Sequence, residues 1–152
     1  MAKKPLPQGM TSLPEYAYLP GQNKRHPDNA FDDIRATAVN GAGAERLARC
    51  DAFLAGLHFF DKGYYWEAHE VLEPVWMALP DGSIERRFVQ GLIQLANGYL
   101  KLRMGRLKAA LRLVGQVRGL MPPVAGASIM SLELQEVHRW IDGLERDIIC
   151  AL

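Results

Sequence analysis

The stretch IERRFVQGLIQLANGYLKLRM, residues 84–104, decides the fold. Apolar and aromatic residues recur at steps of three and four along one face, which is the spacing of a helix, and they are Phe88, Leu92, Leu95, Tyr99 and Leu102. Further apolar residues occupy the other sides, namely Val89, Ile93, Ala96 and Leu100. A helix that is apolar all round is enclosed by other elements. We therefore predict a long, largely buried central helix that begins near Ser83.

Helical patterns continue on both sides of this stretch, separated by turns that contain glycine or proline. We expect helices at about 28–39, from Glu45 to the DKG sequence at 61–63, and at 64–79, 83–104 and 106–120, with a last helix capped by Ser128 or Ser131. No window alternates with period two for long enough to predict a strand. The predicted fold class is all-α: a small bundle of five or six helices built from stacked antiparallel helical hairpins.

A weak internal repeat supports the paired helices. The segments GYYWEAHEVL and GRLKAALRLV begin at Gly63 and Gly105, and each has an alanine five residues after its glycine. We expect each glycine to open the second helix of a pair, with Gly63 ending the preceding helix in a left-handed conformation.

The chain divides into an N-terminal arm and one domain. Residues 1–27 are rich in proline and show no periodicity, so we predict an extended arm that is ordered where it packs on the body. His26 precedes Pro27, which favours an extended backbone at His26. Residues 28–152 form the single helical domain.

Composition narrows the class of protein. The 152 residues are 49% hydrophobic and 23% charged, with a net charge of +1, which is typical of a globular domain. We see no signal peptide and no apolar stretch long enough to span a membrane. Cys50 and Cys150 lack metal-binding spacing, so we expect two free thiols in a cytoplasmic protein.

The sequence HEVLEPVW, residues 69–76, holds the main candidate site. His69 and Glu73 are four residues apart, so their side chains meet on one helix face, whereas Glu70 lies further round. Pro74 lacks an amide proton and therefore leaves the Glu70 carbonyl without its helical partner.

Three interpretations of this stretch compete. His69 and Glu73 can form a semi-buried, hydrogen-bonded structural pair. They can instead bind a divalent metal with a third ligand from His26, Glu70, Gln90 or Gln94, although HEVLE is not the H-E-x-x-H motif of zinc proteases. The third interpretation is metal-free general acid–base catalysis by His69, Glu70 and Glu73.

Two motifs together resemble a known family. H-E-x-x-E-x-x-W at residues 69–76 is followed by QGLIQ at 90–94 and by Gly105. This combination resembles the bacterial domain-of-unknown-function family numbered three hundred and nine, over roughly residues 47–115. The resemblance implies an all-helical fold and implies no activity.

The second motif suggests how the candidate site is completed. Gly91 and Gly98, seven residues apart, allow another helix to approach closely on the side that carries Gln94. We expect that helix to be 64–79, so that Gln94 joins His69, Glu70 and Glu73 in one polar cluster. Trp76 would roof this cluster and His26 would approach it from the arm. Arg87 could pair with Glu70 or Glu73.

A basic stretch is the second candidate site. No acidic residue occurs between Arg86 and Leu132, and Lys108 and Arg112 lie opposite the apolar face of helix 106–120. This face could bind an anion. Alternatively, acidic residues of the last helix neutralise it within the fold or across a homodimer. No aromatic residue interleaves the basic helix, which argues against nucleic acid.

The motifs that are absent limit the functional classes. The sequence contains no nucleophile elbow, no phosphate-binding loop and no complete metal triad. We therefore predict a binding or scaffold protein, with a protein or small-molecule partner. The alternatives are a metal-dependent, hydrolase-like enzyme that uses His69, Glu70 and Glu73, and a polyanion-binding module formed by residues 101–118.

Overall fold

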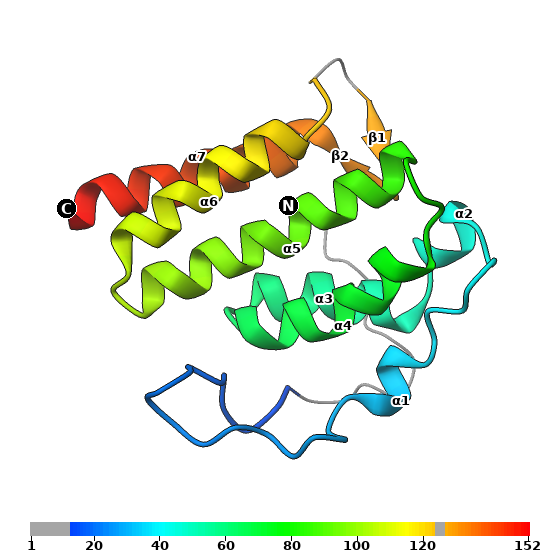
Figure 1. Ribbon diagram of the computed structural model, residues 1–152, viewed down its shortest axis with the longest axis horizontal. Coiled ribbons are helices and arrows are strands. Elements are labelled where there is room, and N and C mark those ends of the chain that lie inside the picture. Colours follow the sequence, from blue (N-terminus) through cyan, green and yellow to red (C-terminus); the bar gives the residue numbers. More distant parts are fainter. Residues whose placement is uncertain (1–12, 124–126) are drawn as a thin grey trace.

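The computed structural model describes residues 13–123 and 127–152. Two short helices, α1 (Asp32–Arg35) and α2 (Ala44–Leu47), precede the body of the molecule. The body consists of α3 (Asp51–Asp61), α4 (Tyr65–Ala78), α5 (Ile84–Arg103), α6 (Leu107–Leu120) and α7 (Leu134–Ala151). Each of these five helices packs on the next one along the chain (Figure 1). The predicted all-α fold of stacked helical hairpins is confirmed.

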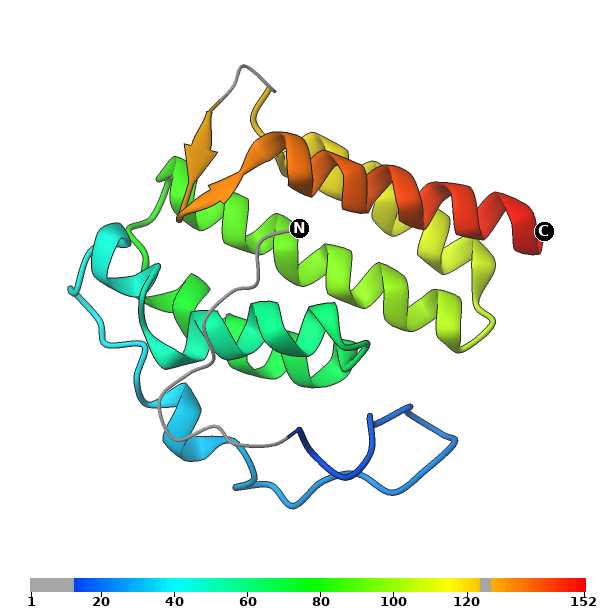
Figure 2. The ribbon, with the colours of Figure 1, turned by 180° about the vertical axis from the view of Figure 1, so that it is seen from behind.

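Helix α5 is the centre of the molecule. It lies between the α3–α4 pair and the α6–α7 pair (Figures 1 and 2). Phe88, Val89, Leu95 and Ala96 are all 0% exposed, which confirms the buried central helix. Its start is also confirmed, because Ser83 Oγ accepts the Arg86 N–H at 3.1 Å. Among the helices of the described residues, none has the length and apolar character needed to cross a lipid bilayer.

The glycine-lined side of α5 faces α6 and α7. A methyl group on Gly91 would collide with the Met121 side chain, and one on Gly98 would lie 2.7 Å from Leu144 Cδ2. The prediction that α4 approaches this side is therefore wrong. The close approach that the two glycines permit is made by the second helical pair.

The two turns of the weak repeat have the same geometry. Gly63 and Gly105 have φ values of 85° and 77°, and each is followed by a residue with φ of −92°. Tyr64 N–H donates to the Phe59 carbonyl at 2.8 Å, and Arg106 N–H donates to the Lys101 carbonyl at 2.9 Å. This six-to-one bond is the Schellman motif that ends a helix at a left-handed glycine. The predicted left-handed cap at Gly63 is confirmed.

The segment before α7 differs from the prediction. Strands β1 (Ser128–Ile129) and β2 (Leu132–Glu133) form an antiparallel hairpin, so the prediction of no strand is wrong for these residues. Met130 and Ser131 form its turn with φ values of 52° and 64°. That conformation usually selects Asn-Gly, so the sequence carried no hairpin signal. The last helix begins after the hairpin, and neither Ser128 nor Ser131 caps it.

The first part of the domain is less helical than predicted. Only Asp32–Arg35 of the predicted helix 28–39 is α-helical, and turns flank it on both sides. Residues 13–27 pass along α3 and α4 without regular secondary structure (Figure 1). The predictions for residues 1–12 and for residues 124–126 of the linker lie outside the described residues.

Substituting alanine at two exposed glycines should have opposite effects. Gly105 has positive φ and open space around it, so Gly105→Ala should lower the free energy of unfolding by about 1 kcal/mol, through backbone strain alone. Gly115 lies inside α6, also in open space, so Gly115→Ala should raise it by about 0.8 kcal/mol. Urea unfolding followed by circular dichroism measures both. Equal effects at the two positions would contradict this account of the turn.

Candidate functional site

A buried carboxylate lies at the start of α4. Glu67 is 0% exposed. Among the residues that the structure describes, it is the one buried residue with an ionisable acidic or basic side chain. It lies in the first turn of its helix, four residues before Val71 of the core. Glu67 is not among the site residues predicted from the sequence. The sequence feature that could have identified Glu67 is an acidic residue on the apolar face of a predicted helix.

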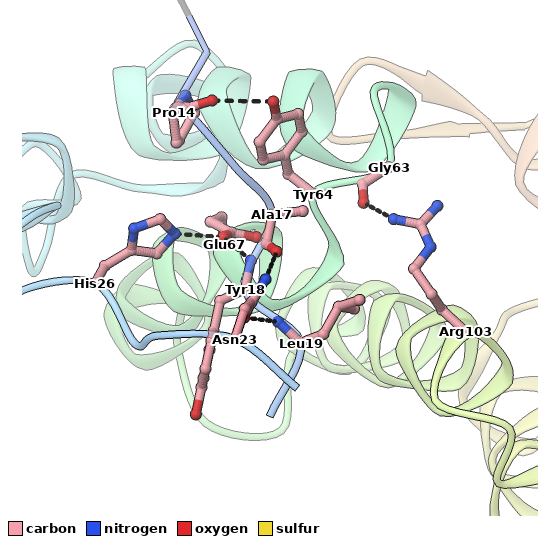
Figure 3. Close-up of polar contacts among 10 residues, drawn as sticks. All are labelled: Pro14, Ala17, Tyr18, Leu19, Asn23, His26, Gly63, Tyr64, Glu67 and Arg103. Atoms are coloured by element: carbon pink, nitrogen blue, oxygen red, sulfur yellow. Dashed lines mark hydrogen bonds and ion pairs between the residues drawn. The ribbon is translucent and has the colours of Figure 1, made fainter. Parts of the chain in front are cut away.

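The arm supplies the partners of this carboxylate. Tyr18 N–H donates to Glu67 Oε2 at 2.7 Å, and His26 Nε2 lies 2.6 Å from the same oxygen (Figure 3). Glu67 Oε1 is buried and has no hydrogen-bond partner within the described parts of the chain. Nearby, the Tyr64 hydroxyl donates to the Pro14 carbonyl at 3.0 Å. The arm is thus fastened to the first turn of α4 at three points.

The Asn23 side chain folds the arm between these points. Its amide oxygen accepts the Leu19 N–H at 2.8 Å, and its amide nitrogen donates to the Ala17 carbonyl at 2.9 Å (Figure 3). These bonds close the loop that returns the chain to His26. The sequence between the two contacts with Glu67 therefore has a defined conformation.

Aromatic rings fix the orientation of His26. Its ring stacks on Tyr16 at a centroid distance of 4.7 Å, and the Phe31 ring meets it edge-on at 5.5 Å. Trp66 lies 6.0 Å away, and the His26 side chain is 9% exposed. Nε2 is the ring nitrogen that forms the hydrogen bond with Glu67. Nδ1 lies on the other side of the ring, away from Glu67 (Figure 3).

His26 also lines a hollow between the arm, α1 and α3, which we call the arm pocket. Its volume is about 870 Å³. Its described wall includes Tyr16, Lys24, Arg25, His26, Phe31 and Phe59. This hollow is open to solvent, has both polar and apolar lining, and is large enough to hold a small molecule.

The HEVLE stretch forms a separate, more exposed cluster. His69 Nε2 lies 3.5 Å from Glu73 Oε2, which confirms that these two side chains meet. Arg35 of α1 lies 3.7 Å from a Glu70 carboxylate oxygen and 3.6 Å from one of Glu73. The Arg35 guanidinium also donates to the Glu70 carbonyl, the group that Pro74 leaves without an amide partner. The predicted loss of this helical bond is thus compensated from α1.

Several predicted members of that cluster lie elsewhere. His26 bonds Glu67, so its predicted approach to His69 is wrong. Gln94 Oε1 accepts from Asn97 Nδ2 at 3.2 Å and lies on the side of α5 that faces away from α4, so its predicted contact is also wrong. No three histidine, cysteine, aspartate or glutamate side chains in residues 13–123 and 127–152 group closely enough to hold a metal ion. A ligand role for Gln90 stays a prediction.

Arginines of the predicted cluster and of the basic stretch have internal partners. The Trp76 ring packs under the Arg86 guanidinium at 4.6 Å. Arg87 donates to the Gly119 carbonyl at 2.6 Å, so its predicted pairing with Glu70 or Glu73 is wrong. Arg118 bonds the carboxylates of α7, at 3.1 Å for Asp142 and 3.2 Å for Glu145.

Lys108 and Arg112 lie on the exposed face of α6. Neither forms an ion pair with the described residues. Anion binding by these two side chains stays a prediction.

A second aromatic group, at the other edge of α4, has a structural explanation. The Tyr65 and Tyr99 rings stack at 5.2 Å, and the Tyr99 hydroxyl donates to the Trp140 carbonyl at 2.6 Å. Burial raises the pKa of Tyr99 to about 12, and it also raises the pKa of Tyr65. Both hydroxyls therefore remain protonated at neutral pH, and the group serves packing between α4, α5 and α7.

Residues 53–113 match the family model DUF309, described as a domain of unknown function. The family resemblance is confirmed. No curated protein and no solved structure matches the chain. The DUF309 match contains Glu67 and the HEVLE cluster, whereas Tyr18, His26 and Arg35 lie before it. Of the residues that line the arm pocket, Phe59 lies in the matched segment and His26 precedes it, and His26 is bonded to Glu67 of the matched segment.

A double-mutant cycle tests whether Arg35 replaces the helical hydrogen bond that Pro74 removes from the Glu70 carbonyl. Arg35→Ala should lower the free energy of unfolding by about 1–2 kcal/mol, because the Glu70 carbonyl loses its donor. Pro74→Ala restores an amide proton at that position. In the Pro74→Ala background, Arg35→Ala should cost at least about 0.5 kcal/mol less, which chemical unfolding measures. Strict additivity of the two changes would show that Arg35 does not replace the missing amide.

The carboxylate of Glu67 should hold the arm in place. Glu67→Ala removes the acceptor of Tyr18 N–H and His26, so we expect a loss of about 2 kcal/mol in unfolding free energy. Hydrogen exchange at the Tyr18 amide should become faster by about tenfold or more. Glu45→Ala is the control, because that side chain is 88% exposed and forms a surface ion pair with Arg49. Unchanged protection of Tyr18 would refute the anchoring role.

Proposed function

We propose that the protein binds a small molecule in the arm pocket, and that His26 is the polar group that recognises it. The observation that supports this most directly is the histidine itself, which lines the pocket while its Nε2 is held by a buried carboxylate. A ring held by a carboxylate and by stacked aromatics presents its remaining nitrogen in one orientation. Fixed polar groups of this kind determine how a ligand is oriented in a site.

The cost of burying Glu67 favours a functional explanation. Taking a carboxylate out of water costs several kcal/mol, and a buried ion pair recovers this only with good geometry and further hydrogen bonds. Here one carboxylate oxygen has two partners, whereas the other is buried and has no partner among residues 13–123 and 127–152. An apolar side chain would fasten the arm at lower cost. The energetic cost of this arrangement therefore supports a role beyond fastening the arm.

A binding protein is a better fit to the arm pocket than an enzyme. A histidine supported by a carboxylate is suited to proton transfer. However, the described wall contains no serine, threonine or cysteine that His26 could activate as a nucleophile. At the HEVLE cluster, Arg35 lies beside both carboxylates, which supports the structural interpretation of His69 and Glu73. Catalysis by His69, Glu70 and Glu73 is the less favoured alternative.

We also propose that the protein is cytoplasmic and that it forms a homodimer. Cys50 and Cys150 are free, which fits a reducing compartment. Burial raises the pKa of the Cys50 thiol, so this group should react slowly with thiol reagents. A homodimer would be supported by a molecular mass of twice 17.0 kDa in solution.

Fragment screening by protein-observed NMR tests the proposed function. Binding compounds should shift the amide resonances of Tyr16, Arg25, Phe31 and Phe59. His26→Gln, which retains a donor toward Glu67, should weaken their binding by about tenfold, as expected for the loss of one charge-assisted or buried hydrogen bond. His138→Gln, on α7, is the matched control and should bind normally. Hits that shift only resonances outside the arm pocket, or no hits at all, would overturn the proposal.

A further inference from the structure

We infer that the arm pocket selects an organic anion: a carboxylate attached to a planar, apolar body. This inference rests on the proposed function and specifies the chemical class of the ligand. It follows from the charges, from the position of Glu67 and from the rings in the wall.

The charged side chains of the wall are mostly cationic. Lys24 and Arg25 both line the arm pocket. Among the described residues that line it, Glu15 is the one with an acidic side chain. Neither Lys24 nor Arg25 forms an ion pair with another described residue. Arg25 instead lies over the Trp66 ring, with its guanidinium carbon 5.7 Å from the centroid. Its charge therefore has no carboxylate partner among the described residues and can attract an anion.

The nearby carboxylate of Glu67 does not favour a cationic ligand. It is 0% exposed, and its Oε2 is already bonded to the Tyr18 amide and to His26. His26 stands at the wall of the pocket, whereas Glu67 is not part of that wall. A ligand therefore meets the imidazole, Lys24 and Arg25 before it meets this negative charge.

The remaining wall suits a flat, apolar body. Phe31, Ile34 and Phe59 line the same hollow; Phe31 and Ile34 are half-buried, and Phe59 is buried. The Tyr16 ring lies on the His26 ring with an interplanar angle of 20°, so these two rings form one aromatic part of the wall. An aromatic ring can stack on such surfaces while its carboxylate reaches the cationic side chains.

Three probes of the same shape and different charge test this inference: 2-naphthoate, the neutral 2-naphthamide, and 2-naphthylmethylammonium. Each is titrated into the full chain, and its dissociation constant is taken from the amide shifts of Tyr16, Phe31 and Phe59. Naphthoate should bind about tenfold more tightly than the ammonium probe, with the amide between them. Added salt should narrow this difference, because the cationic side chains are exposed and are screened by ions.

Two double variants separate charge from stability. Lys24→Gln with Arg25→Gln should weaken naphthoate binding about tenfold, with less than about twofold change for naphthamide. Arg49→Gln with Lys62→Gln removes two other cationic side chains, 67% and 50% exposed, and should change neither constant. Amide spectra that retain the pattern of the parent protein verify that each variant is folded.

The outcomes separate this inference from the proposed function. Equal affinity for the three probes at the arm pocket would overturn the selection of an anion and leave the binding function standing. A preference for the ammonium probe would overturn it in the same way. If none of the probes shifts the pocket resonances, the inference also fails, and the fragment screen alone then decides the binding function.

Discussion

The buried carboxylate of Glu67 imposes the strongest constraint on the structure. A charge that is removed from water must be surrounded by donors, and α4 alone supplies none to its side chain. The positive end of the helix dipole helps, because Glu67 lies in the first turn of α4. The direct donors come from the arm, which brings Tyr18 N–H and His26 to one oxygen. The path of the arm and the arm pocket both follow from this requirement.

A second constraint concerns carbonyl groups that helices leave unbonded. Arginines from other elements satisfy them repeatedly: Arg35 donates to Glu70, Arg86 to Leu79, Arg87 to Gly119 and Arg103 to Gly63. The last three receiving carbonyls lie at or near the ends of α4, α6 and α3, where a positive charge is also favoured by the dipole. Much of the basic stretch thereby has a structural purpose. An arginine-rich sequence without acidic residues need not mark a binding surface.

The sequence allowed the helical body to be predicted because its signals are local. Apolar spacing identified α5, and Gly63 and Gly105 marked turns whose geometry depends on positive φ. The hairpin before α7 was missed because Met130 and Ser131 adopt left-handed conformations without the residues that usually favour them. For the site, helical spacing correctly paired His69 with Glu73, and Pro74 correctly indicated an unbonded carbonyl. The partners of His26, Glu67 and Arg35 could not be predicted, because they depend on how distant segments pack.

The hydrogen bonds that anchor the arm join residues that are far apart in the sequence, and this affects the order in which the protein folds. The body is built from helices that pack on their sequence neighbours, and such local contacts favour rapid folding. The bond from Tyr18 to Glu67 spans 49 residues, and the one from His26 spans 41. Closing these long loops gains little until α4 has formed, so we expect the arm to dock late. The same segment should be among the first to detach by local unfolding, and its detachment would dismantle the arm pocket, most of whose wall it forms, while the helical body stays intact.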